Sequence, residues 1–171
     1  KDIPAFLLPH YDLVEKGRII KETTTEWINI IPITGKKTAV QLALTLNKSG
    51  KLSGDSNLKI SDYAACEFRQ KVADQSVLPN YLSNWFGGSV NNIESTGFDD
   101  SYGNLSVRAQ IDATNHLTQQ NDFYYIPIVL VKQYTENLLQ SEERILPIDL
   151  ITPHEHIYIM HLALEEGLRF E

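Results

Sequence analysis

An alternating stretch at residues 40–46 sets the strongest limit on what this chain can fold into. Its valine and leucine side chains occupy every second position, so in an extended strand they all lie on one side. Residues 47–50 follow with the sequence Asn-Lys-Ser-Gly, which is typical of a turn. We therefore predict a β-hairpin whose return strand covers about residues 51–60, with Gly54 at a β-bulge.

Hydrophobic residues then recur with the period of a helix. Ser61 or Asp62 can cap a first helix, because a short side-chain oxygen accepts hydrogen bonds from the free N–H groups of the first turn. Pro79 at the start and Gly87 at the end delimit a second helix. Its apolar residues have the spacing of a single helical face: Leu78, Tyr81, Leu82, Trp85 and Phe86. Two short helices are therefore predicted within about residues 61–87.

Strands are predicted on both sides of these helices. Residues 104–112 alternate most cleanly, and further strands are expected at 26–31, 90–95, 144–151 and 155–164. The strand at 155–164 is apolar on both faces, which predicts a central place in the sheet. The fold class is therefore mainly β (α+β), an antiparallel sheet or a β-sandwich with two short helices.

Two segments before the last strands are less regular. Residues 115–122 are polar and are expected to form a loop. Residues 123–131 are apolar and are expected to form a buried strand broken at Pro127, because proline cannot donate a hydrogen bond to a neighbouring strand. Residues 132–143 are expected to be helical or irregular.

Composition and charge argue against several classes of partner. The formal net charge is −7 and no run of Lys or Arg exceeds two residues, which argues against binding to nucleic acid or to anionic membrane surfaces. No apolar stretch approaches the length of a membrane span. The hydrophobic fraction of 42% is sufficient for a packed core.

Cys66 is the single cysteine, so neither an internal disulfide nor a cysteine-rich zinc site can form. A catalytic thiol needs a lowered pKa and a nearby base. Cys66 instead stands between Ala65 and Glu67, and a neighbouring carboxylate raises the pKa of a thiol. We interpret Cys66 as a small core residue and predict no catalytic residue in this chain.

His154 and His156 are weak candidates for a metal site. On a strand, two residues of the same parity share a face, as a two-histidine site requires, while His161 would point to the other face. His154 follows Pro153 and is expected to lie in a loop. A third ligand would have to come from elsewhere in the chain, so no metal or other cofactor is predicted.

Aromatic residues suggest a possible binding surface. An exposed aromatic platform would suit a sugar or a peptide, whereas the same residue types are also common on half-buried sheets. The candidates are Trp27, Tyr124, Tyr125, Tyr134 and Tyr158. Two or more of them exposed together in a groove would favour a carbohydrate- or peptide-binding module, and their burial would remove it.

Short segments spread over nearly the whole chain resemble one protein family. The most specific segment combines the sequence Ser-Glu-Glu-Arg at 141–144 with the sequence Pro-Ile-Asp at 147–149. The other matching segments are 27–32, 42–46, 50–54, 62–65 with Arg69, Tyr158 and 164–167. In these features the chain resembles the C-terminal β domain of unknown function that follows a transglutaminase-like (papain-type cysteine peptidase) domain in exported Gram-negative bacterial proteins.

The resemblance implies a role and a place in a longer protein. It implies that residues 1–35 are the tail of, or a linker from, an upstream catalytic domain, and that 36–171 form an accessory β domain. The sequence stops shortly after a turn at 166–167, so we expect a following strand to be missing and this domain to be truncated at its C-terminus. The family's Cys, His and Asp triad would lie upstream of Lys1, so this chain is not expected to be an enzyme. It is expected to position the catalytic module or to contact a substrate or envelope partner, in the periplasm or outside the cell. The alternative is the carbohydrate- or peptide-binding module described above.

Overall fold

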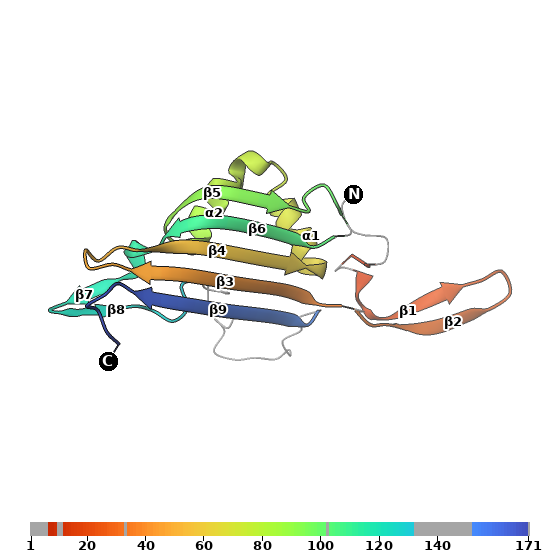
Figure 1. The fold of residues 1–171 in the computed structure, drawn as a ribbon. Helices are drawn as coiled ribbons and strands as arrows, with labels where there is room; N and C mark the ends of the chain where they lie inside the picture. The colour runs from red at the N-terminus through yellow and green to blue at the C-terminus, as the bar shows by residue number, and fades with distance from the viewer. Residues whose placement is uncertain (1–6, 10–11, 33, 102, 132–151, 171) are drawn as a thin grey trace, which may run out of the picture.

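A five-stranded sheet with two helices against one face forms the body of the molecule (Figure 1). The computed structural model describes residues 7–9, 12–32, 34–101, 103–131 and 152–170. Its elements are β1 (Glu15–Ile20), β2 (Thr25–Ile30), β3 (Lys36–Leu46), β4 (Leu52–Ser61), α1 (Asp62–Lys71), α2 (Leu78–Phe86), β5 (Ser89–Thr96), β6 (Leu105–Asp112), β7 (Thr118–Gln120), β8 (Phe123–Tyr125) and β9 (His154–Leu164), with short 3₁₀ turns at Gln75–Val77 and Thr114–His116.

The strands of the body follow the order β5–β6–β4–β3–β9. Neighbouring strands are antiparallel except β9, which runs parallel to β3. Two further ribbons, β1–β2 and β7–β8, project beyond opposite ends of the sheet (Figure 1). The mainly β fold with two short helices is confirmed. Among the described residues helices cover the sheet, so the single-sheet alternative holds and the sandwich does not.

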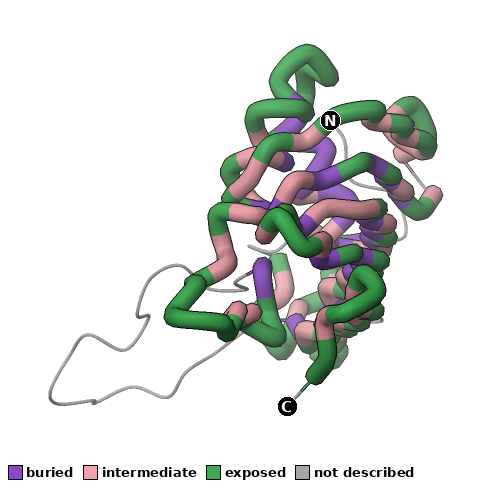
Figure 2. The backbone as a smooth tube through the Cα atoms, turned by 60° about the vertical axis from the view of Figure 1, so that its left-hand side comes forward, coloured by how far each residue is buried: buried purple, intermediate pink, exposed green. Residues whose placement is uncertain are grey.

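The predicted hairpin forms the centre of this sheet. Its apolar side chains are fully buried, and buried positions (purple in Figure 2) alternate with exposed ones along the strands. The β3–β4 register is unbroken at Gly54, so the predicted bulge is wrong. A β-carbon at Gly54 would instead overlap the carbonyl oxygen of Ala43. Glycine is required there because the two backbones come close, and the bulge of this sheet lies in β5, between Asn91 and Glu94.

Both helices lie where the hydrophobic period predicts them. Leu78, Leu82 and Phe86 of α2 are buried in the core, and Gly87 ends the helix with φ +67°, a left-handed conformation that glycine adopts without strain. Phe68 of α1 contacts the other helix through an edge-to-face ring pair. Ser61 is the N-cap residue of α1, but its side chain makes no capping hydrogen bond.

The predictions for the second half of the chain need several corrections. The polar segment 115–122 contains strand β7, and only residues 123–125 of the apolar segment 123–131 form a strand. That segment is also largely exposed, with Ile128 79% accessible, and only Leu130 and Val131 at its end are buried. Among the strands that the structure describes, β9 lies at the sheet edge and not at the centre. The predictions for residues 132–143 and 144–151 lie outside the described residues.

Candidate interaction surfaces

Cys66 is buried in α1, as predicted, and it packs with Leu7 and Tyr63 in a small cluster apart from the main core. The Tyr63 hydroxyl donates a hydrogen bond to the carbonyl oxygen of Leu8 at 2.7 Å. Burial raises the pKa of the Cys66 thiol; nearby Arg69 lowers it, but not enough to offset the burial. A raised pKa is the opposite of what a nucleophile needs, so the contacts of Cys66 are those of a packing residue.

His154 and His156 lie on the same face of β9, as their parity predicts, and both line a hollow of about 320 Å³ beside the ion pair of Lys36 and Glu67. His154 is the first residue of the strand, so its expected place in a loop is wrong. Partial desolvation, with a smaller effect of His154, lowers the pKa of His156.

A metal ion needs more ligands than these two rings. Within the described part of the chain, no three His, Cys, Asp or Glu side chains come close enough to share an ion. His161 lines a different hollow, on the opposite face of the sheet, as expected from its parity. The arrangement therefore offers two imidazoles beside a cation and a carboxylate, which is an incomplete set for zinc.

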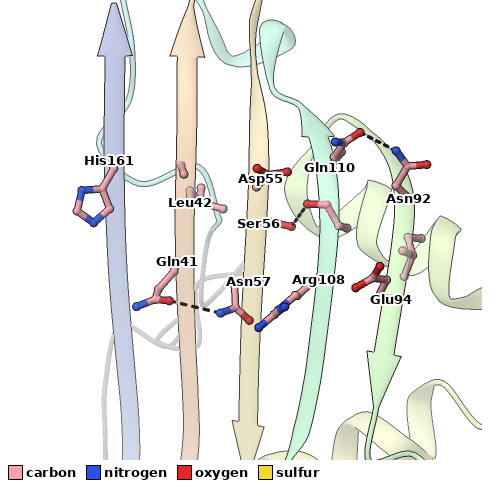
Figure 3. A pocket seen from close by; sticks show the side chains of 13 residues that line it. Gln41, Leu42, Asp55, Ser56, Asn57, Asn92, Glu94, Arg108, Gln110 and His161 are labelled. Atoms are coloured by element: carbon pink, nitrogen blue, oxygen red, sulfur yellow. Dashed lines mark hydrogen bonds between the residues drawn. The ribbon is translucent and has the colours of Figure 1, made fainter.

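The face of the sheet away from the helices carries a polar row across four strands (Figure 3). The register places Gln41 opposite Asn57, Asn57 opposite Arg108, and Arg108 opposite Glu94. Adjacent strands are about 4.8 Å apart, so these side chains are neighbours although they are distant in sequence. Sequence reasoning missed the row, because it becomes visible only when the strand order is known.

A second row completes a hollow of about 870 Å³ on this open face. It contains Asp55 and Gln110 on adjacent strands, and the amide of Asn92 donates a hydrogen bond to Gln110 at 2.7 Å (Figure 3). Asn92 lies in the β5 bulge with φ +49°, which turns its side chain toward Gln110. Asn57 Oδ1 is shielded from solvent and accepts no hydrogen bond from the described residues. The hollow thus offers amide donors and acceptors to a polar ligand.

The β1–β2 ribbon, which we call the arm, extends away from the sheet (Figure 1). Its residues are paired from Glu15 with Ile30 to Ile20 with Thr25. One face carries Trp27, which is 68% exposed, and the Arg18 guanidinium lies 5.8 Å from its ring centre. On the other face, the side chains of Ile28 and Ile30 lie over Gly17, and a β-carbon added to Gly17 would meet the side chain of Ile30.

The predicted aromatic residues do not form one platform. Trp27 is on the arm, whereas Tyr125 lies on β8 at the opposite end of the molecule (Figure 1). Tyr124 and Tyr158 are half-buried and pack against the core. Tyr134 lies outside the described residues. A different aromatic group lines a groove of about 660 Å³ at the β8 end, made by Phe123, Tyr124, Tyr125 and Phe170.

Comparisons with known protein families, curated proteins and solved structures found no match to this chain. No helix in the described ranges combines the length and the apolar character that crossing a membrane requires. The surfaces themselves are therefore the observations from which a function can be argued.

Proposed function

We propose that this chain is a non-catalytic interaction module that docks onto a partner protein through the arm. The observation that carries the proposal is a projecting two-stranded ribbon with large apolar side chains exposed on it. Ile20 is 78% exposed, and Trp27 and Ile28 are also classed as exposed. Isolated apolar residues are common on surfaces, but a ribbon that carries several of them along a few residues is typical of a binding surface.

The physics of a two-stranded ribbon supports the same proposal. Such a ribbon is marginally stable in water unless a further strand or a packed surface covers it. In the arm, the core of the body does not supply this cover, since none of the residues of β1 and β2 is buried. A partner that covers Trp27 and Ile20, which the register places on the same face of the arm, would supply the missing apolar contact, at roughly 25 cal/mol for each Å² of apolar surface removed from water.

The base of the arm is fixed to the body. Leu7 is buried against Tyr63 and Cys66 of α1, and Leu13 packs against this same cluster. The hydrogen bond from Tyr63 to the backbone of Leu8 holds the segment that precedes β1. These contacts attach the segment before the arm to helix α1. Such an attachment suits a module that positions its partner.

The partner we propose is a transglutaminase-like catalytic domain in the same polypeptide, exported to the periplasm or beyond. The support for this partner is the sequence resemblance, in which residues 1–35 correspond to the junction with that domain. The arm lies inside that junction, at Glu15–Ile30, and the body of the sheet starts with β3 at Lys36.

The test compares Trp27→Ser in the natural gene product with Trp27→Ser in the isolated chain. Docking predicts that the substitution lowers the melting temperature and exposes the arm to hydrogen exchange in the long protein. In the isolated chain the same substitution should have little effect, because Trp27 is already exposed. Tyr125→Ser is the matched control, since Tyr125 is 55% exposed on the ribbon at the other end of the sheet.

Two results would contradict the proposal. One is an unchanged melting temperature and unchanged exchange of the arm in the long protein carrying Trp27→Ser. The other is a gene product without a Cys/His/Asp domain upstream of Lys1, which would remove the proposed partner while leaving the arm as a docking surface for another protein.

A second function is favoured by the groove at β8. Phe123 and Tyr125 alternate along β8, so both project to the same side, and they are 47% and 55% exposed. Exposed rings on one side of a groove can stack on the apolar face of a sugar. Calorimetric titration with cellulose and chitin hexasaccharides tests this function. Binding that is lost in Tyr125→Ala and kept in Trp27→Ala supports it, and absence of heat with both sugars removes it.

A further inference from the structure

The last strand has the composition of a central strand and the position of an edge strand. Within the described residues, β9 pairs with β3 alone. Its open-face side chains include Ile157 and Ile159, which are 45% and 37% exposed. Buried strands are apolar on both faces, whereas an edge strand with this composition leaves apolar side chains and backbone hydrogen-bonding groups available to another strand.

Within the described part of the chain, β9 lacks several of the usual protections of an exposed edge. It is eleven residues long, and its register with β3 continues without a bulge from His154 to Leu164. It contains no lysine, arginine, proline or glycine, and Glu155 is its one acidic residue. Natural proteins protect edges by short strands, lysines, prolines, bulges or a covering helix or loop. No described strand pairs with the free edge of β9, so this edge is suited to the addition of a further strand.

We propose that a second copy of this chain adds its β9 antiparallel to this edge, around a two-fold axis at Tyr158. This places Glu155 opposite His161 of the partner subunit, and Ile157 opposite Ile159 of the partner subunit. Each pair occurs twice by symmetry, and all four residues of one copy lie on the open face, as alternate residues of the strand. The self-pairing places a carboxylate opposite an imidazole, which can donate a hydrogen bond to it, and covers exposed isoleucines with one another.

Neighbouring registers do not offer this match. An axis at Ile159 would place Glu155 opposite Ala163 and Ile157 opposite His161 of the partner subunit. An axis at Ile157 would place Glu155 opposite Ile159 of the partner subunit. The axis at Tyr158 is therefore selected by the carboxylate–imidazole pairs and by the pairing of like side chains, because cross-strand pairs of this kind fix strand register.

Charge exchange tests the register. Sedimentation velocity over a range of protein concentrations should show a monomer–dimer equilibrium. His161→Glu places two carboxylates opposite each other twice, so the dimer Kd should rise about fivefold or more. Glu155→Lys should also weaken the dimer, and the double variant Glu155→Lys with His161→Glu should restore it. Gln41→Lys is the matched control, because Gln41 lies on the same face but one strand inside the edge.

A cross-link tests the geometry independently of affinity. Cys66 is the single cysteine, so Cys66→Ala provides a background without thiols. In this background, an oxidised mixture of Ile157→Cys and Ile159→Cys chains should form disulfide-linked heterodimers, since directly opposite residues come within disulfide reach. Either chain alone should form far fewer linked dimers.

Several outcomes would overturn the proposal. These are a wild-type chain that is monomeric at every concentration, a dimer that Ile159→Lys leaves unchanged, and a double charge variant no tighter than the single ones. A monomer that binds an extended peptide at β9 would show that the edge receives a strand from a different chain. None of these results bears on the arm, so the two proposals can fail separately.

Discussion

Replacement of Arg69 should destabilise the body more than any other single change of a charged residue described here. Arg69 lies on α1 with 8% of its surface exposed. Its Nε and Nη2 donate to the carbonyl oxygen of Gly97 at 3.1 and 2.8 Å, and Nη2 also donates to the carbonyl oxygen of Gly103 at 2.6 Å. One guanidinium thus holds both ends of the loop between β5 and β6 against the helix.

The magnitude follows from these three hydrogen bonds. Arg69→Met keeps the length of the side chain but leaves two carbonyl oxygens without their charged donor. Hydrogen bonds to charged groups contribute about 1.5–3 kcal/mol each, and an unsatisfied buried carbonyl costs about 1–3 kcal/mol. Relief of the desolvation of the guanidinium offsets part of this loss. We therefore expect a net loss of about 2–4 kcal/mol in the free energy of unfolding.

Urea denaturation followed by circular dichroism measures the effect. With a slope of about 1–3 kcal/mol per molar urea, the midpoint should fall by at least about 0.7 M. Arg108→Met is the matched control, because Arg108 is exposed on the open face and its loss should change stability by no more than about 0.5 kcal/mol. Arg69→Lys should recover less than half of the loss, since an ammonium cannot reproduce the planar fork. If Arg69→Met and Arg108→Met shift the midpoint equally, the loop is not held by the guanidinium.

Three other predictions concern packing, pH and reactivity. Gly54→Ala should cost about 2 kcal/mol or more in unfolding free energy, because the β-carbon would overlap the backbone of β3, whereas Ser53→Ala should be nearly neutral in the same urea assay. Hydrogen bonds from Thr114 lower the pKa of Asp112, so this carboxylate stabilises the fold above its usual pKa and the contribution is lost as the pH falls through the lowered value. Asp112→Asn should therefore reduce stability at neutral pH and make its loss in acid less steep, as acid titration of the unfolding midpoint would show. Cys66 should react slowly with a thiol reagent in the folded chain, and Cys-dependent amidase turnover abolished by Cys66→Ala would contradict its interpretation as a packing residue.

Local patterns predicted the elements whose burial is decided locally. The apolar spacing of α2, together with Pro79 and Gly87, determines its start, its buried face and its end. The period of two in β3 determines which side chains enter the core, because a shift by one residue would expose all of them. These features need no information about distant parts of the chain.

Features that depend on strand order could not be predicted in this way. The polar row joins residues from β3, β4, β6 and β5, and their contacts exist because the sheet places these strands side by side. Gly54 gives the same sequence signal for a bulge and for close backbones, and the opposing carbonyl of Ala43 decides between them. The groove at β8 likewise joins Phe123 to Phe170, which are far apart in sequence.

For β9, the sequence pattern predicts a central strand, whereas the described sheet places it at an edge. Here the pattern and the position are both well defined, so neither a weak signal nor an unknown strand order explains the difference. The apolar composition of β9, which includes Ile157 and Ile159, predicts a central strand. Among the described strands β9 is instead at the edge, and both isoleucines are exposed. The arm shows the same conflict, with Trp27 and Ile28 on a ribbon that the body does not cover. Natural sequences are consistent with their folds except where function requires otherwise. Because the two conflicts lie on different elements, we propose a separate partner for each: a transglutaminase-like domain for the arm and a second copy of this chain for β9.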